Sequence, residues 1–381
     1  MKFKIFLCVV LCSTINLFAQ NNFVYVNDDN APNRVSAFSV NPDGSLTLIA
    51  GSPFLTGGNG SGFNKIDAGK ITTATVKGAG FVYAANNADG TATGFSVNPQ
   101  TGSLVIVPGS PFNITAPNSG PALASSPNGQ FLFAVDDVNP VVRVFSIAGD
   151  TGALTEASGS PFNLGAPAQT VKVSPSGRFL AVGLESNTVE IFAIKSNGAL
   201  TPAAGSPVPT SGTPTGIDIN CHSNRLFVSN AGSPLINAFQ MEEDGSLAPV
   251  PGSPFPSGGS GIDVALTLTP NNRFLLTSDT FSDAVSSLAV APNGSLQAAP
   301  GSPFGGSDFE GKIETTRAGN FVYAALFAQD AVDGWSISAT GTLAPVPGRP
   351  FSTGGSPLGE ASMVTFPAPS CSAHRSSRRE E

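Results

Sequence analysis

The chain has little charge. Asp, Glu, Lys and Arg make up 12% of its 381 residues, about half of the roughly 25% that is usual for soluble domains. Gly (43) and Pro (32) are abundant instead, and Phe occurs 27 times. A composition poor in charge and rich in turn-forming residues predicts sheets that are covered on both faces and joined by tight turns. The large apolar content argues against a disordered chain.

Histidine and cysteine are scarce, with two His and four Cys in the whole sequence. Cys221 and His222 are neighbours, but there is no second Cys–His pair to complete a zinc site. The sequence also lacks the dense Asp-x-Asp-x-Asp-Gly loop that binds Ca²⁺ and the Gly-x-Ser-x-Gly elbow of serine hydrolases. We therefore expect no metal site and no cofactor.

Residues 1–19 differ from the rest of the chain. Lys2 and Lys4 precede an apolar run that ends at Phe18, and Ala19 is a small residue before Gln20. This layout is typical of a cleavable secretory signal, and it predicts a secreted or periplasmic protein without a membrane span after cleavage. A retained membrane anchor is the alternative, although the run is short, because a spanning helix needs about 20 apolar residues.

Cleavage would remove two of the 18 basic residues and none of the 26 acidic ones, so the formal net charge would change from −8 to −10. This balance disfavours nucleic acid and anionic lipid as partners, because both require basic surfaces. Cys221 and Cys371 would be the remaining cysteines. One lies in the middle of the chain and the other in its tail, and the sequence leaves open whether their Cα atoms come close enough to pair.

A Gly-Ser-Pro-Phe motif organises the chain. It returns seven times with small changes, and the steps between first glycines are 58, 50, 46, 47, 49 and 47 residues. A period in this range indicates a repeat architecture. The copies are 51–54, 109–112, 159–162, 205–208, 252–255, 301–304 and 348–351.

Each repeat predicts four short strands joined by tight turns. In one unit the strands are 170–174, 178–182, 188–194 and 199–203, and Asn197-Gly198 provides a hairpin turn between the last two. The order predicts an antiparallel meander. The third strand carries a large apolar residue at one fixed position, which we expect to fill the core between neighbouring sheets: Phe38, Phe95, Phe145, Phe192, Phe239, Leu288 and Trp335.

The two ends of the chain complement each other. The first unit begins at a second strand, 23–26, whereas the last motif is followed by a lone first strand, 362–366. Pairing these two segments would complete the seventh sheet and leave no unpaired end. The sequence therefore predicts an all-β, seven-bladed β-propeller at residues 20–366, and a disordered tail at residues 367–381.

Several segments resemble the lactonase-type seven-bladed propeller family, which includes 6-phosphogluconolactonase-like and muconate lactonizing enzyme-like proteins. They are 174–180 (Ser-Pro-Ser-Gly-Arg-Phe-Leu), 186–192 (Ser-Asn-Thr-Val-Glu-Ile-Phe), 101–104 (Thr-Gly-Ser-Leu) and the Gly-Ser-Pro-Phe endings. Tyr25-Val-Asn27 is also similar to the Tyr-Val-Thr-Asn repeats of surface-layer propellers. The resemblance covers residues 23–366 and implies hydrolysis of a lactone.

The enzymes of that family commonly carry Pro-Arg-His just before a first strand. The corresponding positions here are Gly120-Pro-Ala122 and Ala168-Gln-Thr170, and neither contains the Arg-His pair. The resemblance therefore supports the fold more strongly than it supports the activity.

Lactone hydrolysis needs a base to activate water and donors or cations to hold the developing oxyanion. In a propeller, the loops that lead into the first strands surround the central channel on one face. On this face, Glu310, Lys312 and Glu314 fall on one side of an extended segment and are the candidate catalytic residues. The candidate substrate-binding residues are Lys65, Lys70, Lys172, Glu185 and Glu360; a solvated ion cluster is the alternative interpretation.

Acids and amides also recur in the turns between second and third strands. Oxygen ligands of this type could hold a cation such as Ca²⁺, but Asp and Asn are common turn residues that cap local backbone donors, and we favour that role. The residues are Asp28, Asp29, Asn86, Asp89, Asp136, Asp137, Asn230, Asp279, Asp283 and Asp330.

Two functions remain open. The first is an exported, non-enzymatic propeller, expected to be a monomer, that presents its channel face to a glycan, a polypeptide or an envelope partner. The second is a lactonase with a substituted site that acts on a sugar lactone or a carboxylated lactone. The missing Arg-His pair, the scarcity of histidine and the export signal favour the first, whereas the family resemblance favours the second.

Overall fold

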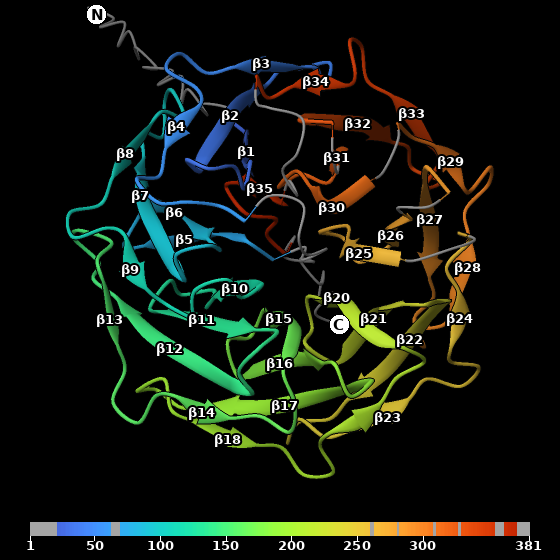
Figure 1. The fold of residues 1–381 in the computed structure, drawn as a ribbon. Helices are drawn as coiled ribbons and strands as arrows, with labels where there is room; N and C mark the ends of the chain where they lie inside the picture. The colour runs from blue at the N-terminus through green and yellow to red at the C-terminus, as the bar shows by residue number, and fades with distance from the viewer. Residues whose placement is uncertain are drawn as a thin grey trace, which may run out of the picture.

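The structure is a computed structural model that describes residues 21–61, 69–259, 263–279, 282–307, 310–326, 329–354 and 362–371. Their strands form seven five-stranded antiparallel sheets, which are arranged as blades around a central channel (Figure 1). The predicted seven-bladed propeller is confirmed. Within these residues, no helix has the length and apolar character needed to cross a membrane. The predicted signal peptide, residues 1–19, lies outside the described residues.

Blade 1 contains β35 and β1–β4, and blades 2 to 7 follow along the chain with five strands each. The first strands line the channel: β35 (Ser362–Phe366), β5 (Ile71–Val76), β10 (Pro121–Ser125), β15 (Ala168–Val173), β20 (Thr213–Ile219), β25 (Asp263–Leu268) and β30 (Glu310–Thr315). The second strands are β1 (Phe23–Asn27), β6 (Ala79–Asn86), β11 (Phe131–Asp136), β16 (Phe179–Leu184), β21 (Arg225–Ala231), β26 (Phe274–Asp279) and β31 (Phe321–Leu326).

The third strands are β2 (Arg34–Val40), β7 (Thr91–Val97), β12 (Val141–Ile147), β17 (Thr188–Ile194), β22 (Ser233–Met241), β27 (Ala284–Val290) and β32 (Ala331–Ile337). The fourth strands are β3 (Leu46–Leu48), β8 (Leu104–Ile106), β13 (Leu154–Glu156), β18 (Leu200–Pro202), β23 (Leu247–Pro249), β28 (Leu296–Ala298) and β33 (Leu343–Pro345). The short fifth strands are β4 (Phe54–Leu55), β9 (Phe112–Asn113), β14 (Phe162–Asn163), β19 (Val208–Pro209), β24 (Phe255–Pro256), β29 (Phe304–Gly305) and β34 (Phe351–Ser352).

The two ends of the chain close the ring, as predicted. β35 pairs antiparallel with β1 from Phe366 opposite Phe23 to Ser362 opposite Asn27. Blade 1 therefore takes its innermost strand from the C-terminal end and its other strands from the N-terminal end (Figure 1).

The Gly-Ser-Pro-Phe motif divides the outer edge of each blade, and this accounts for the fifth strand that the sequence did not predict. The fourth strand stops before the motif, and the motif's last residue begins a short strand that pairs with the start of the same third strand. The third-strand N–H that faces the interruption donates to the motif serine; in blade 1 the Ala37 N–H donates to Ser52 Oγ at 2.9 Å. Five other blades repeat this bond at 2.7–3.0 Å.

The core lies between the blades. Seven buried apolar clusters occur, one between each pair of neighbouring blades. The large apolar residue at the fixed position of the third strand, from Phe38 in blade 1 to Trp335 in blade 7, is at most 3% exposed. This confirms its predicted role in the core. Burial of each such side chain contributes about 2–3 kcal/mol. Tyrosines add a polar link to the next blade, since the Tyr25 and Tyr83 hydroxyls donate to the Gly102 and Gly152 carbonyls at 2.8 and 2.7 Å.

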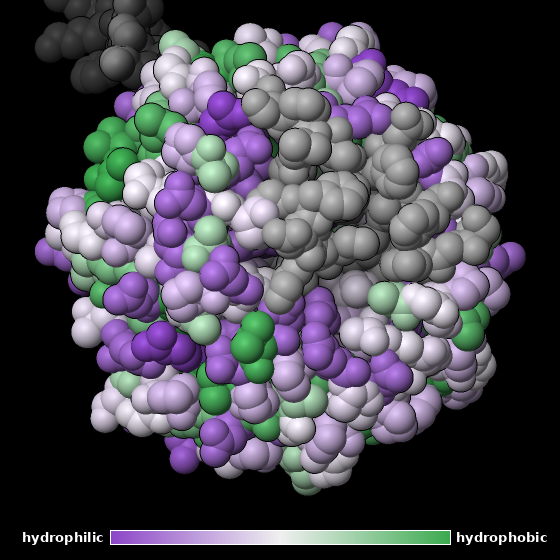
Figure 2. Space-filling view, viewed as in Figure 1, coloured by the Kyte–Doolittle hydropathy of each residue, from purple (hydrophilic) through white to green (hydrophobic). Residues whose placement is uncertain are grey.

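Few large apolar side chains reach the surface. Among the described residues, five are between 45% and 65% exposed: Leu48, Leu55, Val105, Ile106 and Val138. The first four belong to outer strands of blades 1 and 2. Figure 2 shows the corresponding hydrophobic area over β4 and β8, whereas polar residues dominate the rest of the coloured face.

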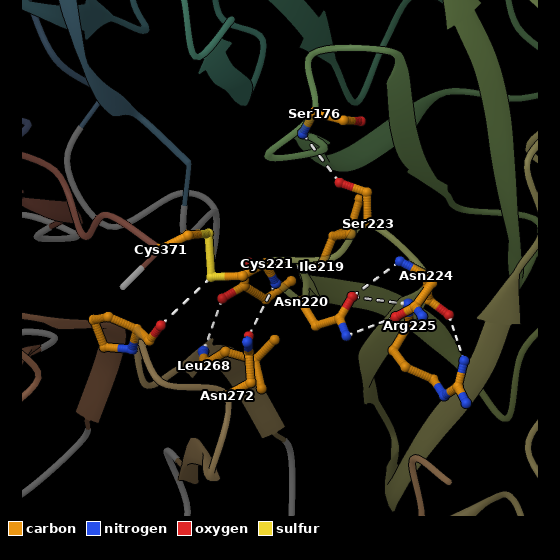
Figure 3. Close-up of a disulfide and its surroundings, with 12 residues drawn as sticks. Ser176, Ile219, Asn220, Cys221, Ser223, Asn224, Arg225, Leu268, Asn272 and Cys371 are labelled. Carbon is orange, nitrogen blue, oxygen red and sulfur yellow. Dashed lines mark hydrogen bonds between the residues drawn. A yellow bond between two sulfur atoms is a disulfide. The ribbon is translucent and has the colours of Figure 1, made fainter. Parts of the chain in front are cut away.

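The chain does not leave the ring at Phe366. Cys371 is bonded to Cys221, which lies on the turn between β20 and β21 of blade 5, and their Cα atoms are 5.3 Å apart (Figure 3). The sequence left this pairing open and assigned residues 367–381 to a disordered tail. The disulfide ties residues 367–371, here called the strap, to the ring. Residues 372–381 lie outside the described residues.

Candidate functional site

The central channel contains a cavity of about 560 Å³, a volume typical of small-molecule sites. The first strands of all seven blades line it. It extends to the turns that join first to second strands, including Pro127, Pro175 and Pro270, and the strap lines it at this end. Because the strap runs from blade 1 to blade 5, it narrows one mouth of the channel.

One position of the first strand contributes to the cavity wall in every blade. In blades 1, 2 and 7 this first-strand residue pairs with a tyrosine of the second strand, namely Tyr25, Tyr83 or Tyr323. In the other blades it pairs with the equivalent residue of the second strand. In blades 4 to 7 this position holds Lys172, Asp218, Thr267 and Glu314. In blades 1 to 3 it holds Val364, Thr72 and Ala124. One side of this layer is therefore charged and polar, and the other is small and largely apolar.

Asp218 fixes the position of Lys172. Lys172 Nζ lies 3.0 Å from Asp218 Oδ1. Asp218 is itself held by backbone donors, since its two carboxylate oxygens accept the N–H groups of Ile219 and Leu268 at 2.9 and 2.8 Å. Burial alone would lower the pKa of Lys172, but the Asp218 and Glu314 carboxylates outweigh it, so this pKa is raised. Lys172 is therefore a protonated lysine on the cavity wall, and Asp218 holds it in position.

Glu314, in blade 7, lies at the opposite end of this charged and polar row from Lys172, in blade 4. Thr267 Oγ1 donates to Glu314 Oε1 in a long hydrogen bond of 3.5 Å. Burial raises the pKa of Glu314, and the ammonium groups of Lys172 and Lys312 oppose this shift without cancelling it. The carboxylate is therefore a stronger base than an ordinary glutamate.

Lys312 lines the cavity two residues before Glu314 on β30. Burial lowers its pKa, Glu314 opposes the shift, and the nearby Lys172 cation lowers the pKa further. A β-bulge between Glu310 and Ile313 interrupts the alternation of β30. The prediction that alternate residues of this strand face the same side therefore holds for Lys312 and Glu314. It does not extend to Glu310, whose side chain the structure does not describe.

The other predicted site residues lie elsewhere. Lys70 is fully buried, and its Nζ lies 3.0 Å from Oδ2 of the equally buried Asp29 in blade 1. Glu185 is exposed on the turn after β16 and accepts a hydrogen bond from Gln169 at 2.8 Å. Lys65 and Glu360 lie outside the described residues. The structure thus brings together Lys172, Lys312 and Glu314, but neither Lys70 nor Glu185 is among the residues that line the cavity.

Sequence reasoning missed Asp218 and Thr267, together with Arg317 at the end of the cavity near the strap. Aligning the repeats on the turn after each first strand would have found the first two, because they occupy the same column as Lys172 and Glu314. Arg317 lies in the turn itself, where the sequence carries no comparable signal.

The acids of the second-to-third strand turns have more than one role. Asp136 Oδ1 accepts the Val138 and Asn139 N–H groups at 2.9 and 2.6 Å, which is the predicted turn capping. Asp29 instead pairs with Lys70. In the part of the chain that the structure describes, no group of three His, Cys, Asp or Glu residues is arranged to hold a metal ion.

Part of the sequence matches the profile of a known protein family. Residues 75–215 and 112–264 match the sequence profile of the family described as lactonase, 7-bladed beta-propeller. None of the curated proteins matches the chain significantly.

Solved structures share the architecture. A candidate 6-phosphogluconolactonase of Bacteroides fragilis is 15% identical with a TM-score of 0.72, and the match covers 91% of this chain and 98% of that one. The periplasmic gluconolactonase of Pseudomonas aeruginosa is 17% identical with a TM-score of 0.70, covering 91% and 99%. At these identities the likeness shows the fold alone.

Proposed function

Because the chain belongs to the lactonase family of seven-bladed β-propellers, we propose that it hydrolyses a lactone in its central cavity. The observation that supports this most directly is the position of Lys172 and Glu314 at equivalent sites of blades 4 and 7, where both line one cavity. A cation and a base on the same wall are the two groups that ester hydrolysis requires.

In the proposed reaction, Glu314 accepts a proton from a water molecule as the water oxygen attacks the lactone carbonyl carbon. Lys172 donates a hydrogen bond to the carbonyl oxygen, where negative charge develops. The ring C–O bond then breaks, the ring oxygen takes up a proton, and the product is a hydroxy acid. Asp218 positions Lys172 through their 3.0 Å contact. The raised pKa of Glu314 suits a general base.

The site departs from the Pro-Arg-His pattern of the family's enzymes. The corresponding positions, 120–122 and 168–170, contain no arginine or histidine. This substitution favours the second candidate function, a binding protein that holds a small ligand in the same cavity without turning it over. Export, which also enters that hypothesis, stays a prediction.

A panel of sugar lactones and carboxylated lactones, assayed with purified protein, tests the proposal. We expect turnover of at least one lactone, and a loss of about 10²–10⁴ in kcat for Glu314→Gln, the range for removing a general base. Lys172→Met should lower kcat as well, whereas Lys195→Met, on the exposed surface, should not. Absence of turnover across the panel, with binding of a lactone detected by calorimetry, would reject hydrolysis and support the binding function.

A further inference from the structure

Lys312 lines the cavity but makes no contact with the lactone in the proposed hydrolysis. Among the described residues, its ammonium group makes no hydrogen bond or ion pair. Lys172, the other lysine of this wall, is held by Asp218 at 3.0 Å. The cavity thus contains one lysine whose amine is occupied and one whose amine is available to a ligand.

The surroundings of Lys312 favour its nucleophilic form. A lysine attacks carbonyl carbon as the neutral amine, and both desolvation and a neighbouring cation increase the neutral fraction. Lys312 has both, because it lies in the channel and the Lys172 cation is close enough to lower its pKa further. A lysine pKa that is lower by one gives a neutral fraction about tenfold larger at a given pH.

The cavity also offers space and a proton donor. Ala124, Thr72 and Val364 form the small-residue part of the wall. Glu314 follows Lys312 by two residues on β30, and both line the cavity. A glutamate with a raised pKa retains its proton to higher pH than usual, so a fraction of Glu314 can act as an acid.

We propose that Lys312 captures small aldehydes or ketones by forming a reversible imine in the central cavity. The lone pair of Nζ forms a bond to the carbonyl carbon, and the carbonyl oxygen becomes a hydroxyl group after proton transfer from nitrogen. Protonated Glu314 then gives its proton to this hydroxyl, which leaves as water while the C=N bond forms. The nitrogen then releases its remaining proton to the Glu314 carboxylate as the neutral imine forms, so the step needs no oxidant or reductant.

The ligand class is a short hydroxyaldehyde or hydroxyketone. Its carbonyl carbon meets Lys312, and its hydroxyl groups can bond to Thr72 and Thr267, which line the same cavity. This reaction goes beyond lactone hydrolysis, because it requires a carbonyl compound rather than an ester and uses a different nucleophile.

Reductive trapping tests the proposal. The full chain is incubated with glyceraldehyde and cyanoborohydride near pH 7, and the modified lysines are located and timed by peptide mass spectrometry. Lys77 and Lys195 are exposed and serve as internal controls. We expect Lys312 to be labelled about tenfold faster than either control, because desolvation and the neighbouring Lys172 cation both increase the neutral, nucleophilic fraction of its amine.

Three variants sharpen the test. Lys312→Arg keeps a cation and should abolish the fast labelling, whereas Lys195→Met should keep it. Glu314→Gln should slow the labelling of Lys312 without moving it to another lysine. Equal labelling rates of Lys312 and the surface lysines, or fast labelling that persists in a folded Lys312→Arg protein, would overturn the proposal. Absence of lactone turnover would not affect it, because trapping needs no hydrolysis.

Discussion

Arg349 Nη1 lies 2.8 Å from Asp333 Oδ2 in blade 7, where the six other blades have a motif serine that accepts a third-strand N–H. Arginine cannot accept this bond. Asp333 Oδ1 accepts the Gly334 N–H at 2.8 Å instead, and the Arg349 guanidinium lies 4.8 Å from the centre of the Trp335 ring. The pair therefore performs the role of one serine.

This relationship predicts a compensating double substitution. Arg349→Met leaves the fully buried Asp333 without its counter-charge and should lower the free energy of unfolding by about 3–5 kcal/mol. Asp333→Ser combined with Arg349→Ser restores the pattern of the other blades and should lose much less. Denaturant unfolding measures both, and equal losses would show that the two side chains are not coupled.

The seam between blades 1 and 7 should make stability depend on pH. Burial raises the pKa of Asp28 to about 7, Ser36 and Arg34 oppose the shift, and Asp330 adds to it. Because an unfolded aspartate titrates near 3.9, the folded state binds more protons between these values. Stability should therefore fall as the pH rises through this window.

Asp28→Asn removes the titrating group. Between pH 4 and pH 8 the free energy of unfolding of this variant should fall less than that of the unsubstituted protein. A pKa difference of one between the folded and unfolded states corresponds to about 1.4 kcal/mol. Parallel unfolding curves for the two proteins across this range would contradict the raised pKa.

The proposed hydrolysis predicts an acid limb in the pH profile. A base must be deprotonated, so kcat/KM should rise with pH through the pKa of Glu314, which lies above its usual 4.5. Lys172 and Lys312 both hold that pKa down. Lys312→Met should therefore move the limb to higher pH. A limb that stays in place would show that Glu314 is not the titrating base.

The disulfide should contribute to both stability and shape. Cys221 and Cys371 are 150 residues apart, so Cys371→Ser should lower the free energy of unfolding by about 2–5 kcal/mol. It should also free the strap, and bulkier lactones should then be accepted. Unchanged stability together with an unchanged substrate range would show that the strap does not limit the cavity.

Ring closure predicts a larger loss when β35 is deleted. Ending the chain before Ser362 exposes the edge of β1 and opens the contacts of Met363, Val364 and Phe366 with both neighbouring blades. Cys371→Ser is the matched control, because it loses the disulfide but keeps the strand. The truncated protein should unfold at a clearly lower temperature than this control, and equal melting temperatures would contradict ring closure.

The repeat made the fold readable from sequence, because each blade uses the same strand columns and the same proline-containing break. The site was only partly readable. Lys312 and Glu314 followed from strand alternation, but the bulge after Glu310 was not visible in the sequence. Lys70 was predicted to be a channel residue because the sequence does not reveal its ion-pair partner. This partner, Asp29, belongs to another blade and lies 41 positions away in the chain. Asp218 is the single acid of β20, and its place in the wall follows only when its repeat is aligned with those that contain Lys172 and Glu314.

The bond between Cys221 and Cys371 has a consequence for a nicked chain. It closes a covalent loop that contains most of blade 5, blades 6 and 7, and the strand that completes blade 1. A protease that cuts once inside this loop leaves two fragments that remain one molecule until a reductant is added. A single cut in blades 2 to 4 lies outside this loop and divides the polypeptide into two pieces that the Cys221–Cys371 bond does not join.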